Sequence, residues 1–340
     1  MNRILNNESK PKVYILHENK EWILPLIEAL EGLQTPFEEW FLDRGTIDIS
    51  KAPPSGVFYN RMSASSHTRG NRYAVELTGP ILAWLSAYNR KVLNGRRALQ
   101  LEVRKIEQYL SLQQFGIRTP KTIAAVGETE IIKAVYELNM FPFILKPNRG
   151  GKGLDVRLFH SIKDIKTFLR QATLPEVSLD GVFLVQEYIK PKNDRITRLE
   201  FIDAKFLYAV SVDTSDGFEL CPADDCQIGD IACPTSSTTG TNKFEIIEDF
   251  SIPEIAVCED FLKANAIDIA GMEFIEDEAG ERFFYDVNTN TNYNCEAELR
   301  SNSEVFGMNV IAELLTQELE KERVVSRNKN RVRKAVASYH

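Results

Sequence analysis

The sequence lacks the marks of a membrane-spanning protein and of a disulfide-stabilised secreted one. Nowhere in its 340 residues is there an apolar run of about 18, the length needed to cross a bilayer. The N-terminus, MNRILNNESKPK, has no apolar core of the kind found in signal peptides. Cysteine is scarce, and an odd count of five favours reduced thiols over a disulfide framework. These absences predict a cytoplasmic protein without a membrane partner.

An excess of positive charge is also absent, because the net charge is −8 at pH 7. This acidic balance argues against a nucleic-acid partner for the chain as a whole. Only residues 321–340 form a basic tail, with seven Lys/Arg and one Glu. A solvated terminus explains this tail better than an acidic partner or nucleic acid does. With 43% apolar and 26% charged residues, the chain is typical of a globular protein of two or three packed domains.

Strand and helix patterns alternate in the first part of the chain. Short β-forming runs at 13–16 and 56–60 predict strands, and apolar residues at helical spacing predict helices at 22–30 and 74–88. This alternation predicts a small α/β domain over 1–95.

A basic segment follows the second of these strands and contains Arg61, Arg69 and Arg72. The guanidinium group matches the geometry of a carboxylate, so these arginines are candidates for binding a substrate carboxylate. A solvated basic loop explains them equally well. His67 lies in the same segment, and a lone histidine is more often structural or exposed than catalytic.

The remaining chain mixes helices with β-rich segments. Periodicity predicts one helix over 98–115, on which Leu101, Ile106, Tyr109 and Leu110 share an apolar face. The other predicted elements are strands at 143–146, 154–159 and 182–185, β-rich segments at 201–212 and 272–287, and helices at 162–172, 252–264 and 305–319.

Residues 272–288 carry the clearest chemical signal, two apolar arms around a charged, Gly-containing turn that is typical of a β-hairpin. A turn centred on 279–280 would place Glu273 directly opposite Asp286, with Asn288 on the same face. Two carboxylates and an amide oxygen are hard ligands that suit Mg²⁺ shared with substrate phosphates. An exposed face with incidental acids is the alternative, and the hairpin alone does not separate the two.

A glycine-rich loop with Gly150, Gly151 and Gly153 lies between two predicted strands. A Rossmann turn or a P-loop needs a following helix, so this context argues against both. The backbone N–H groups of such a loop can still cover phosphates, and Lys146 at the end of the preceding strand would add a positive charge. A flexible turn with solvated lysines is the alternative. Together with the acidic face later in the chain, the loop indicates phosphate binding, because phosphate chemistry needs both a phosphate-binding loop and a metal site.

These parts, in this order, resemble the ATP-grasp superfamily over about residues 96–315, and most closely its RimK-like group of carboxylate–amine ligases. The resemblance implies an α/β (α+β) ATP-grasp fold with an N-terminal α/β domain at 1–95. A small subdomain with the glycine loop would span 96–185, and a subdomain with the metal site would span 186–320, before the basic tail.

The resemblance also implies roles for individual residues. The segments that carry it are Val103-Arg-Lys105, Phe143-Ile-Leu-Lys146 with the glycine loop, Gln186-Glu-Tyr-Ile189, and Glu273 with Asp286-Val-Asn288. The nucleotide would be bound by Lys105, Lys146, Gly150, Gly151, Gly153, Gln186, Glu187, Tyr188, Ile189 and Asp194. The metal, Mg²⁺ or Mn²⁺ in its place, would be held by Glu273, Asp286 and Asn288. The reacting groups would be contacted by Arg198 and Asn290.

The sequence departs from the family pattern at several positions. Asp286 replaces the commoner Glu, which keeps the charge. The family's D-x-R aligns with 196–198 and lacks its acid, which Asp194 nearby could replace. The usual Asn-x-Ser-Pro-Gly is here Asn-Thr-Asn-Thr-Asn-Tyr-Asn at 288–294, and an arginine expected after Val212 is missing. The pocket for the acceptor substrate is therefore expected to differ from that of well-known ligases.

The activity implied by the resemblance is ATP-dependent formation of an amide or peptide bond through an acyl phosphate. The partners would be a small-molecule carboxylate and an amine, one of them an amino acid or small peptide, and a homo-oligomer is compatible with this. A kinase that phosphorylates a small molecule and a nucleotide sensor without turnover stay open as alternatives. Cys221, Cys226 and Cys233 could bind zinc, but their spacing does not match the common zinc knuckles, which favours reduced thiols in a substrate loop.

Overall fold

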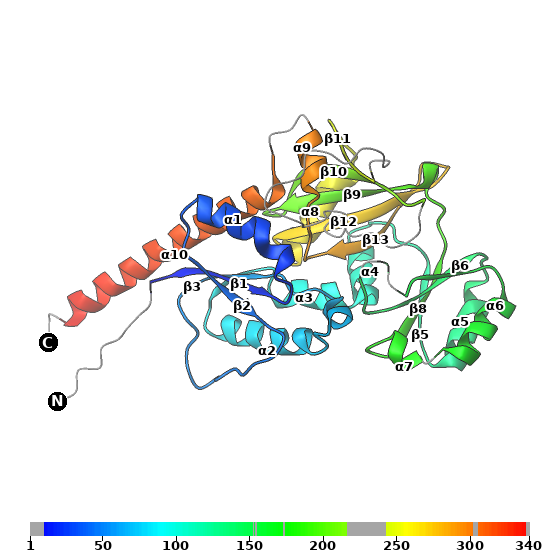
Figure 1. The fold of residues 1–340 in the computed structure, drawn as a ribbon, viewed down its shortest axis with the longest axis horizontal. Coiled ribbons are helices and arrows are strands. Elements are labelled where there is room, and N and C mark those ends of the chain that lie inside the picture. The colour runs from blue at the N-terminus through cyan, green and yellow to red at the C-terminus, as the bar shows by residue number, and fades with distance from the viewer. Residues whose placement is uncertain are drawn as a thin grey trace.

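Three β-sheets organise the chain (Figure 1). The computed structural model describes residues 10–151, 153, 155–172, 174–215, 243–301 and 305–337. Cys221, Cys226 and Cys233 lie outside these ranges, so the hypothesis about them stays a prediction. No helix in the described ranges is long and apolar enough to cross a membrane.

The N-terminal sheet is parallel and has the strand order β2-β1-β3-β4. Its strands and helices are β1 Lys12–His17, α1 Leu24–Gly32, β2 Phe37–Phe41, β3 Gly56–Asn60, α2 Ala74–Ala87 and β4 Lys91–Leu93. The strands predicted at 13–16 and 56–60 are confirmed, because each is an unbroken apolar run buried in the middle of the sheet. The two edge strands were not predicted, since β2 carries Glu38 and Glu39 and β4 has only three residues.

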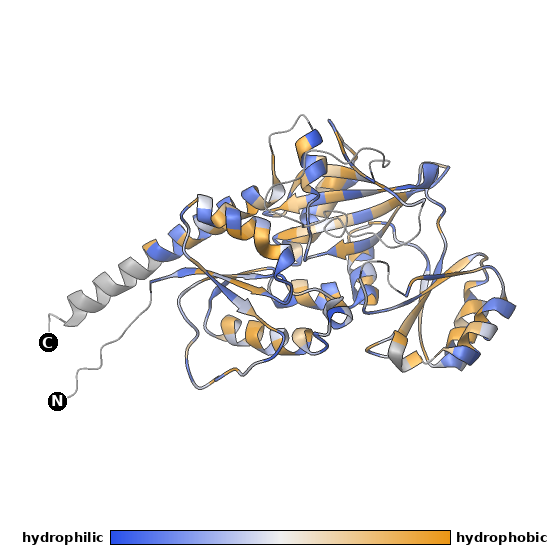
Figure 2. Cartoon of the chain, in the orientation of Figure 1, coloured by the Kyte–Doolittle hydropathy of each residue, from blue (hydrophilic) through white to orange (hydrophobic). Residues whose placement is uncertain are grey.

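The middle sheet is antiparallel, with the order β5-β8-β6-β7. Its elements are β5 Thr122–Val126, α5 Glu128–Leu138, β6 Phe143–Pro147, β7 Arg157–Phe159, α6 Ile162–Gln171, α7 Leu174–Val177 and β8 Val182–Glu187. Helices α5 and α6 lie together beside the sheet, and Figure 2 shows their polar residues turned outward. The strand predicted at 154–159 forms only in its second half.

The helix predicted over 98–115 is two helices, α3 Arg96–Val103 and α4 Lys105–Gln114. The break is at Arg104, whose φ of −138° and ψ of 86° are not helical. A break shifts the helical phase, so Leu110, predicted on the apolar face, is instead 56% exposed. The break also makes Lys105, which was predicted to bind the nucleotide, the first residue of α4 and not a residue inside a helix.

The C-terminal sheet has five antiparallel strands in the order β11-β10-β9-β12-β13. Its elements are β9 Arg195–Ile202, β10 Lys205–Asp213, β11 Phe244–Ile247, α8 Glu254–Ala264, β12 Ile269–Glu276, β13 Arg282–Asn288 and α9 Cys295–Arg300. Residues of α4 and α8 form one apolar core with this sheet, so Lys105 starts a helix that is packed against the strands of the predicted metal site.

The predicted hairpin is β12 and β13, and Glu273 does lie opposite Asp286. Nearer the turn, however, the pairing is shifted by one residue from the prediction, because Phe274 pairs with Phe284 and not with Tyr285. An irregularity between these two pairs leaves Tyr285 as an extra residue, which is the arrangement of a β-bulge. The predicted register is therefore right for the acidic pair and wrong for the tip of the hairpin.

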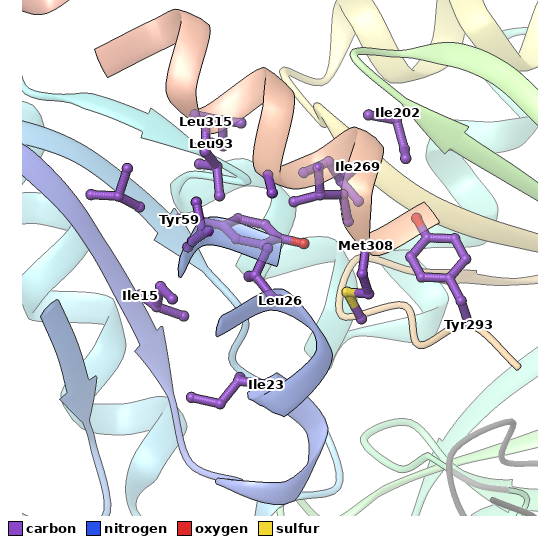
Figure 3. Packing of buried hydrophobic residues seen from close by; sticks show 14 of the residues in the cluster. Ile15, Ile23, Leu26, Tyr59, Leu93, Ile202, Ile269, Tyr293, Met308 and Leu315 are labelled. Carbon is purple, nitrogen blue, oxygen red and sulfur yellow. The ribbon is translucent and has the colours of Figure 1, made fainter. Parts of the chain in front are cut away.

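Helix α10, Gly307–Ala337, joins the N-terminal sheet to the C-terminal sheet. It is longer than the predicted 305–319 and continues through most of the predicted tail. In Figure 3, Met308 and Leu315 of this helix meet Leu26 and Tyr59 of the N-terminal part. The shared apolar core fixes the N-terminal sheet against the rest of the molecule, and with it the segment that contains Arg61.

Candidate active site

A cavity of about 450 Å³ is lined by strands of the middle and C-terminal sheets and, from the N-terminal part, by Trp22, Ser63 and Ser65. Its size suits a small ligand. The residues predicted for nucleotide, metal and the reacting groups all line it: Lys105, Lys146, Gly150, Gly151, Gly153, Gln186, Glu187, Tyr188, Ile189, Asp194, Arg198, Glu273, Asp286, Asn288 and Asn290. Sites from residue 105 to residue 290 of the sequence therefore share one cavity. Arg61, Arg69 and Arg72 do not line it.

The acidic pair of the hairpin faces this cavity together with Asn288. The bulge turns Tyr285 to the same side, where its hydroxyl donates to Glu273 Oε2 at 2.8 Å. No group of three His, Cys, Asp or Glu that could hold a metal occurs in the part of the chain that the structure describes. The candidate set is two carboxylates and one amide, which suits a metal whose other ligands are phosphate oxygens and water.

Each carboxylate of the pair is held by its own cation. Lys105 Nζ lies 2.5 Å from Asp286 Oδ1, and Arg198 Nη1 lies 3.0 Å from Glu273 Oε1. Opposed like charges would otherwise destabilise the hairpin. Burial alone would lower the pKa of Lys105, but Asp286, Tyr109 and Glu102 together outweigh burial and raise the pKa. Burial also raises the pKa of Glu273, although Arg198 opposes this shift.

Arg198 is buried at the centre of a polar network. Its Nε lies 2.5 Å from Glu200 Oε1, and its Nη2 donates to the hydroxyl of Thr291. A Cβ added at Gly271 would come within 2.6 Å of the guanidinium, so glycine on β12 leaves the space that the arginine fills. Glu200, which lies two residues later on the same face of β9, is an acidic partner of Arg198 that was not predicted. Sequence reasoning missed it, although i and i+2 on a strand share a face. The replacement of the missing acid by Asp194 stays a prediction.

Lys146 is 6% exposed at the end of β6. Its Nζ donates to the hydroxyl of Tyr109 at 2.7 Å, and that hydroxyl donates to the carbonyl oxygen of Tyr285 at 2.8 Å. The ammonium group also lies over the ring of Tyr109, 5.3 Å from its centroid. These contacts fix a positive charge beside the acidic hairpin. Tyr109 was not predicted as a site residue.

The glycine-rich loop begins at Asn148, which ties it to α4. Asn148 accepts hydrogen bonds from the backbone N–H groups of Lys105 and Ile106, at 3.2 and 3.0 Å. These are the first two N–H groups of α4, which have no partner inside the helix. The loop and Lys105 are therefore held in one arrangement.

Farther along, the same loop lies against the N-terminal part of the chain. Arg149 Nη1 lies 2.5 Å from Glu76 Oε1 of α2. A Cβ added at Gly151 would come within 3.2 Å of Ser65 Cβ, which is tighter than an ordinary contact. The glycine allows the loop to approach Ser65 this closely.

The segment from Gln186 to Ile189 contains the last two residues of β8 and the two that follow it. It lines the cavity together with apolar side chains such as Ile144 and Ile275. Gln186 Nε2 donates to Thr122 Oγ1 at 2.7 Å, which holds the end of β8 against β5. An apolar slot with backbone polar groups at its edge suits a flat aromatic base. Contact of this segment with adenine stays a prediction.

The three arginines of the basic segment differ in their surroundings. Arg61 is buried, and all its hydrogen bonds go to groups of the protein. Arg69 pairs with Glu18 at 2.5 Å and lies over the ring of Trp22, 4.4 Å from its centroid. Arg72 is exposed. This arrangement gives none of them direct access to a ligand in the cavity, in contrast to the prediction that they bind a substrate carboxylate.

Glu102 of α3 lines the cavity and was not predicted. Its two carboxylate oxygens accept hydrogen bonds from the backbone N–H groups of Ala64 and Thr289, at 3.2 and 2.7 Å. Burial raises its pKa. The sequence offers no signal for this role beyond a glutamate in a helix, because both partners are far away along the chain.

Two groups of side chains differ in character within the cavity. We call Lys105, Arg198, Glu273 and Asp286 the charged end. We call Ser63, Ser65, Asn290 and Asn292 the neutral end, since it consists of hydroxyl and amide groups.

Comparison with known proteins relates part of the sequence to one family. A model described as a RimK-like ATP-grasp domain matches residues 103–219. The glutamate–LysW ligase ArgX of Sulfolobus acidocaldarius is 34% identical over 130 residues, which are 36% of this chain and 46% of that protein. The α-aminoadipate–LysW ligase LysX of Sulfurisphaera tokodaii is 28% identical over 109 residues, 32% of this chain and 38% of that protein. The chain thus spans less than half the length of these relatives.

Solved structures resemble the whole described fold. The ATP-grasp ligase PsnB, in complex with a minimal precursor, superposes with a TM-score of 0.63 at 15% identity, covering 91% of this chain and 100% of that one. The D-cycloserine synthetase DcsG superposes with a TM-score of 0.61 at 16% identity, covering 90% and 99%. The expected ATP-grasp fold is confirmed by these matches, which at such identity bear on the fold alone.

Proposed function

We propose that this chain, which contains a RimK-like ATP-grasp domain, is an ATP-dependent ligase that joins a carboxylate to an amine. The observation that carries the proposal is the charged end, where two opposed carboxylates each hold a cation beside a glycine-rich loop. Phosphoryl transfer depends mainly on placement and charge neutralisation, and this arrangement offers both.

ATP would lie along the cavity from β8 to the hairpin. Its base would contact the segment from Gln186 to Ile189, and Asp194 would lie nearby. Its phosphates would be neutralised by Lys105 and Lys146, which are fixed by contacts with Asp286 and Tyr109. The backbone N–H groups of the glycine-rich loop would cover the phosphates and exclude water.

The donor set of Glu273, Asp286 and Asn288 fits Mg²⁺, because this ion is commonly held by one or two protein carboxylates and completed by phosphate oxygens. Lys105 and Arg198 already show that the two carboxylates attract positive charge in this fold. When bound, Mg²⁺ would neutralise phosphate oxygens and polarise the phosphorus for attack. Mn²⁺ suits the same oxygen ligands.

The reaction would proceed in two steps. A carboxylate oxygen of the first substrate attacks the γ-phosphorus of ATP, the bond to ADP breaks, and an acyl phosphate forms. The amine nitrogen then attacks the acyl carbon, phosphate leaves, and the amine loses a proton. Arg198 is the candidate to stabilise the transferring group, and Asn290 would contact the acceptor substrate.

An amino acid or a small peptide is proposed as one of the two substrates. The support comes from the relatives, since ArgX and LysX are named for the glutamate and α-aminoadipate that they join to LysW. PsnB was solved with a precursor peptide. The expected partners are therefore a small carboxylate and an amine.

The test is ADP release from purified protein with pairs of amino acids and carboxylates, followed by mass spectrometry of the product. A ligase yields a product whose mass is the sum of both substrates less one water, and it releases phosphate only when the amine is present. A phosphorylated product formed without an amine would show a kinase instead. ADP release with none of the pairs would defeat the proposal and leave nucleotide binding without turnover.

A further inference from the structure

Arg61 uses every donor of its guanidinium group within the protein. Nε donates to Asn290 Oδ1 at 3.1 Å, and Nη2 donates to Asn292 Oδ1 at 2.7 Å and to the carbonyl oxygen of Thr291 at 2.9 Å. Nη1 donates to the carbonyl oxygen of Trp22 at 3.1 Å and contacts the sulfur of Met308 at 3.8 Å. A single buried arginine thus holds three successive residues that follow the metal ligand Asn288.

None of these acceptors carries a charge. Arg61 forms no ion pair in the described ranges of the chain, whereas Arg198 has two carboxylates and Arg69 has Glu18. Its own charge is therefore not cancelled by the groups that it contacts. A buried charge without a counterion acts over a longer distance than one in a pair, because no opposite charge beside it cancels its field.

The contacts with Arg61 also decide how two amide groups are turned. A guanidinium group donates only, so the atom of Asn290 and of Asn292 that faces it must be the oxygen. The NH₂ group of each amide must then point the other way. This orientation follows from the chemistry of the pair and not from an arbitrary choice between two similar atoms.

Both amide nitrogens are available to a ligand. Asn290 and Asn292 line the cavity, at 4% and 7% exposed. Neither Nδ2 atom has a hydrogen-bond partner in the described part of the chain, and neither belongs to the buried atoms without a partner, so both keep some contact with solvent. We call these two NH₂ groups the amide cradle.

The surroundings reinforce this donor character. Ser63 and Ser65 line the same end with hydroxyl groups 2.9 Å apart. Glu102 also lines the cavity, but both its oxygens accept backbone N–H groups. The neutral end therefore presents free donors to its contents, backed by the charge of Arg61.

We propose that Arg61 is a positioning residue that makes the amide cradle specific for a carboxylate of a substrate. The cradle would donate to the carboxylate oxygens directly, and the charge of Arg61 would act on them through Asn290 and Asn292. This inference rests on the proposed function, which supplies the reaction. Binding of a carboxylate by the cradle can be tested without it. The sequence predicted that a substrate carboxylate contacts Arg61 directly. Here the carboxylate contacts the two amides that Arg61 orients.

Ligand binding without turnover tests the cradle. Thermal shift is measured, with ADP and Mg²⁺ present, for the twenty common amino acids, for their α-carboxamides, and for carboxylic acids of matching chain length without the amino group. Asn292→Asp replaces a donor by a carboxylate beside Arg61, so it should weaken binding of carboxylates roughly 10- to 100-fold. ADP affinity should not change. Asn139→Asp adds the same charge at an exposed position and serves as the control.

The carboxylic acids show which substrate the cradle holds. If they bind as amino acids do and lose affinity in Asn292→Asp, the cradle holds the carboxylate that is activated. If only amino acids bind and lose affinity in Asn292→Asp, the cradle holds a carboxylate of the amine substrate. Equal binding of carboxamides and carboxylates, unchanged binding by the variant, or no binding of carboxylates to the wild type would each overturn the proposal. Asn290→Asp repeats the test if the first variant does not fold.

Turnover adds a readout that a purely structural role would not move. In Asn292→Asp, KM for the carboxylate-bearing substrate should rise while KM for ATP stays the same, and the carboxamide should become the better substrate relative to the acid. A parallel loss for both forms would mean that Arg61 only holds the loop. Failure of every substrate pair to release ADP would defeat the proposed ligase, while the binding measurements would still decide on the cradle.

Discussion

The two ends of the cavity place arginine in opposite surroundings. At the charged end, Arg198 pairs with Glu200 and Glu273, and Lys105 pairs with Asp286, so that each cation has an opposite charge within a few ångströms. At the neutral end, Arg61 is surrounded by amide and carbonyl oxygens and keeps its charge. Both arginines are 2% exposed. Burial alone therefore does not decide what a buried arginine does, because its partners decide it.

The difference indicates that the two ends bind different kinds of ligand. Paired charges form a site that can exchange its cations, since a metal or a phosphate can replace one partner without leaving a buried charge alone. An uncompensated cation behind neutral donors instead favours one kind of ligand, an anion, because the anion supplies the opposite charge that the site itself lacks. The predictions that follow test this difference.

The largest effect is expected at the charged end. Asp286→Asn removes one of the two carboxylates of the proposed metal site, so kcat should fall about a thousandfold, or ~4 kcal/mol of transition-state stabilisation. The loss should be the same for every acceptor substrate, because the change concerns phosphoryl transfer and not recognition. Steady-state kinetics with saturating substrates measure it. Glu281→Gln, at the exposed tip of the same hairpin, should leave kcat unchanged; activity above a tenth of wild type in Asp286→Asn would contradict the metal site.

Stability should distinguish the two arginines next. Arg198→Met leaves Glu200 buried without its cation, which should destabilise the fold by about 3 kcal/mol at pH 8. Burial raises the pKa of Glu200 above its ordinary value, and loss of Arg198 removes an opposing influence. A carboxylate with a raised folded-state pKa lowers stability above its unfolded pKa, and the penalty disappears as the pH falls through the folded pKa.

The Arg198→Met variant should therefore recover stability between pH 8 and pH 5.5 relative to wild type. Arg61→Met should show no such recovery, because no acid loses its partner there. Urea denaturation at both pH values measures the difference. If the free energy of unfolding depends on pH in the same way in both variants, the two arginines do not differ in the charges that they compensate.

The chemistry of the charged end could be predicted from the sequence, because few residue types can bind a metal and the hairpin brings them together within 17 positions. The pairing of Glu273 with Asp286, however, was predicted from a register that holds for only part of the hairpin. The predicted pairing next to the turn was off by one residue, and the bulge at Tyr285 restored the register at Glu273 and Asp286. A bulge depends on packing of both strands, and the pattern of apolar residues does not reveal it.

The neutral end could not be predicted in the same way. Arg61 and its partners Asn290 and Asn292 are more than 200 positions apart, and amides and serines occur at many sites without a ligand. The sequence identified Arg61 as a candidate, but it gave no sign that Asn290 and Asn292 are its partners. The break at Arg104 was missed for a similar reason, since α3 and α4 satisfy helical periodicity separately and their phase depends on packing.

A moderate effect is expected where the glycine-rich loop meets the neutral end. Gly151→Ala would bring a Cβ within 3.2 Å of Ser65, so the loop should be displaced and KM for ATP should rise about tenfold. Ser65→Gly in the same chain removes the opposing atom and should restore part of the affinity. Gly32→Ala, which meets no atom within 4 Å, is the control for a glycine replaced without crowding. An unchanged KM in Gly151→Ala would show that the loop does not need this contact.

The smallest effect reports on the charge of Arg61 itself. Burial lowers the pKa of His17, and Arg61 lowers it further, while Asn19 and Glu39 oppose the shift. If the charge of Arg61 is uncompensated, Arg61→Met should raise the pKa of His17, whereas loss of the exposed Arg72 should not. NMR titration of the ring measures this, with His17→Gln to assign the signal among four histidines. An unchanged pKa in Arg61→Met would mean that other groups already cancel the charge, and the neutral end would then differ from the charged end only in its hydrogen bonds.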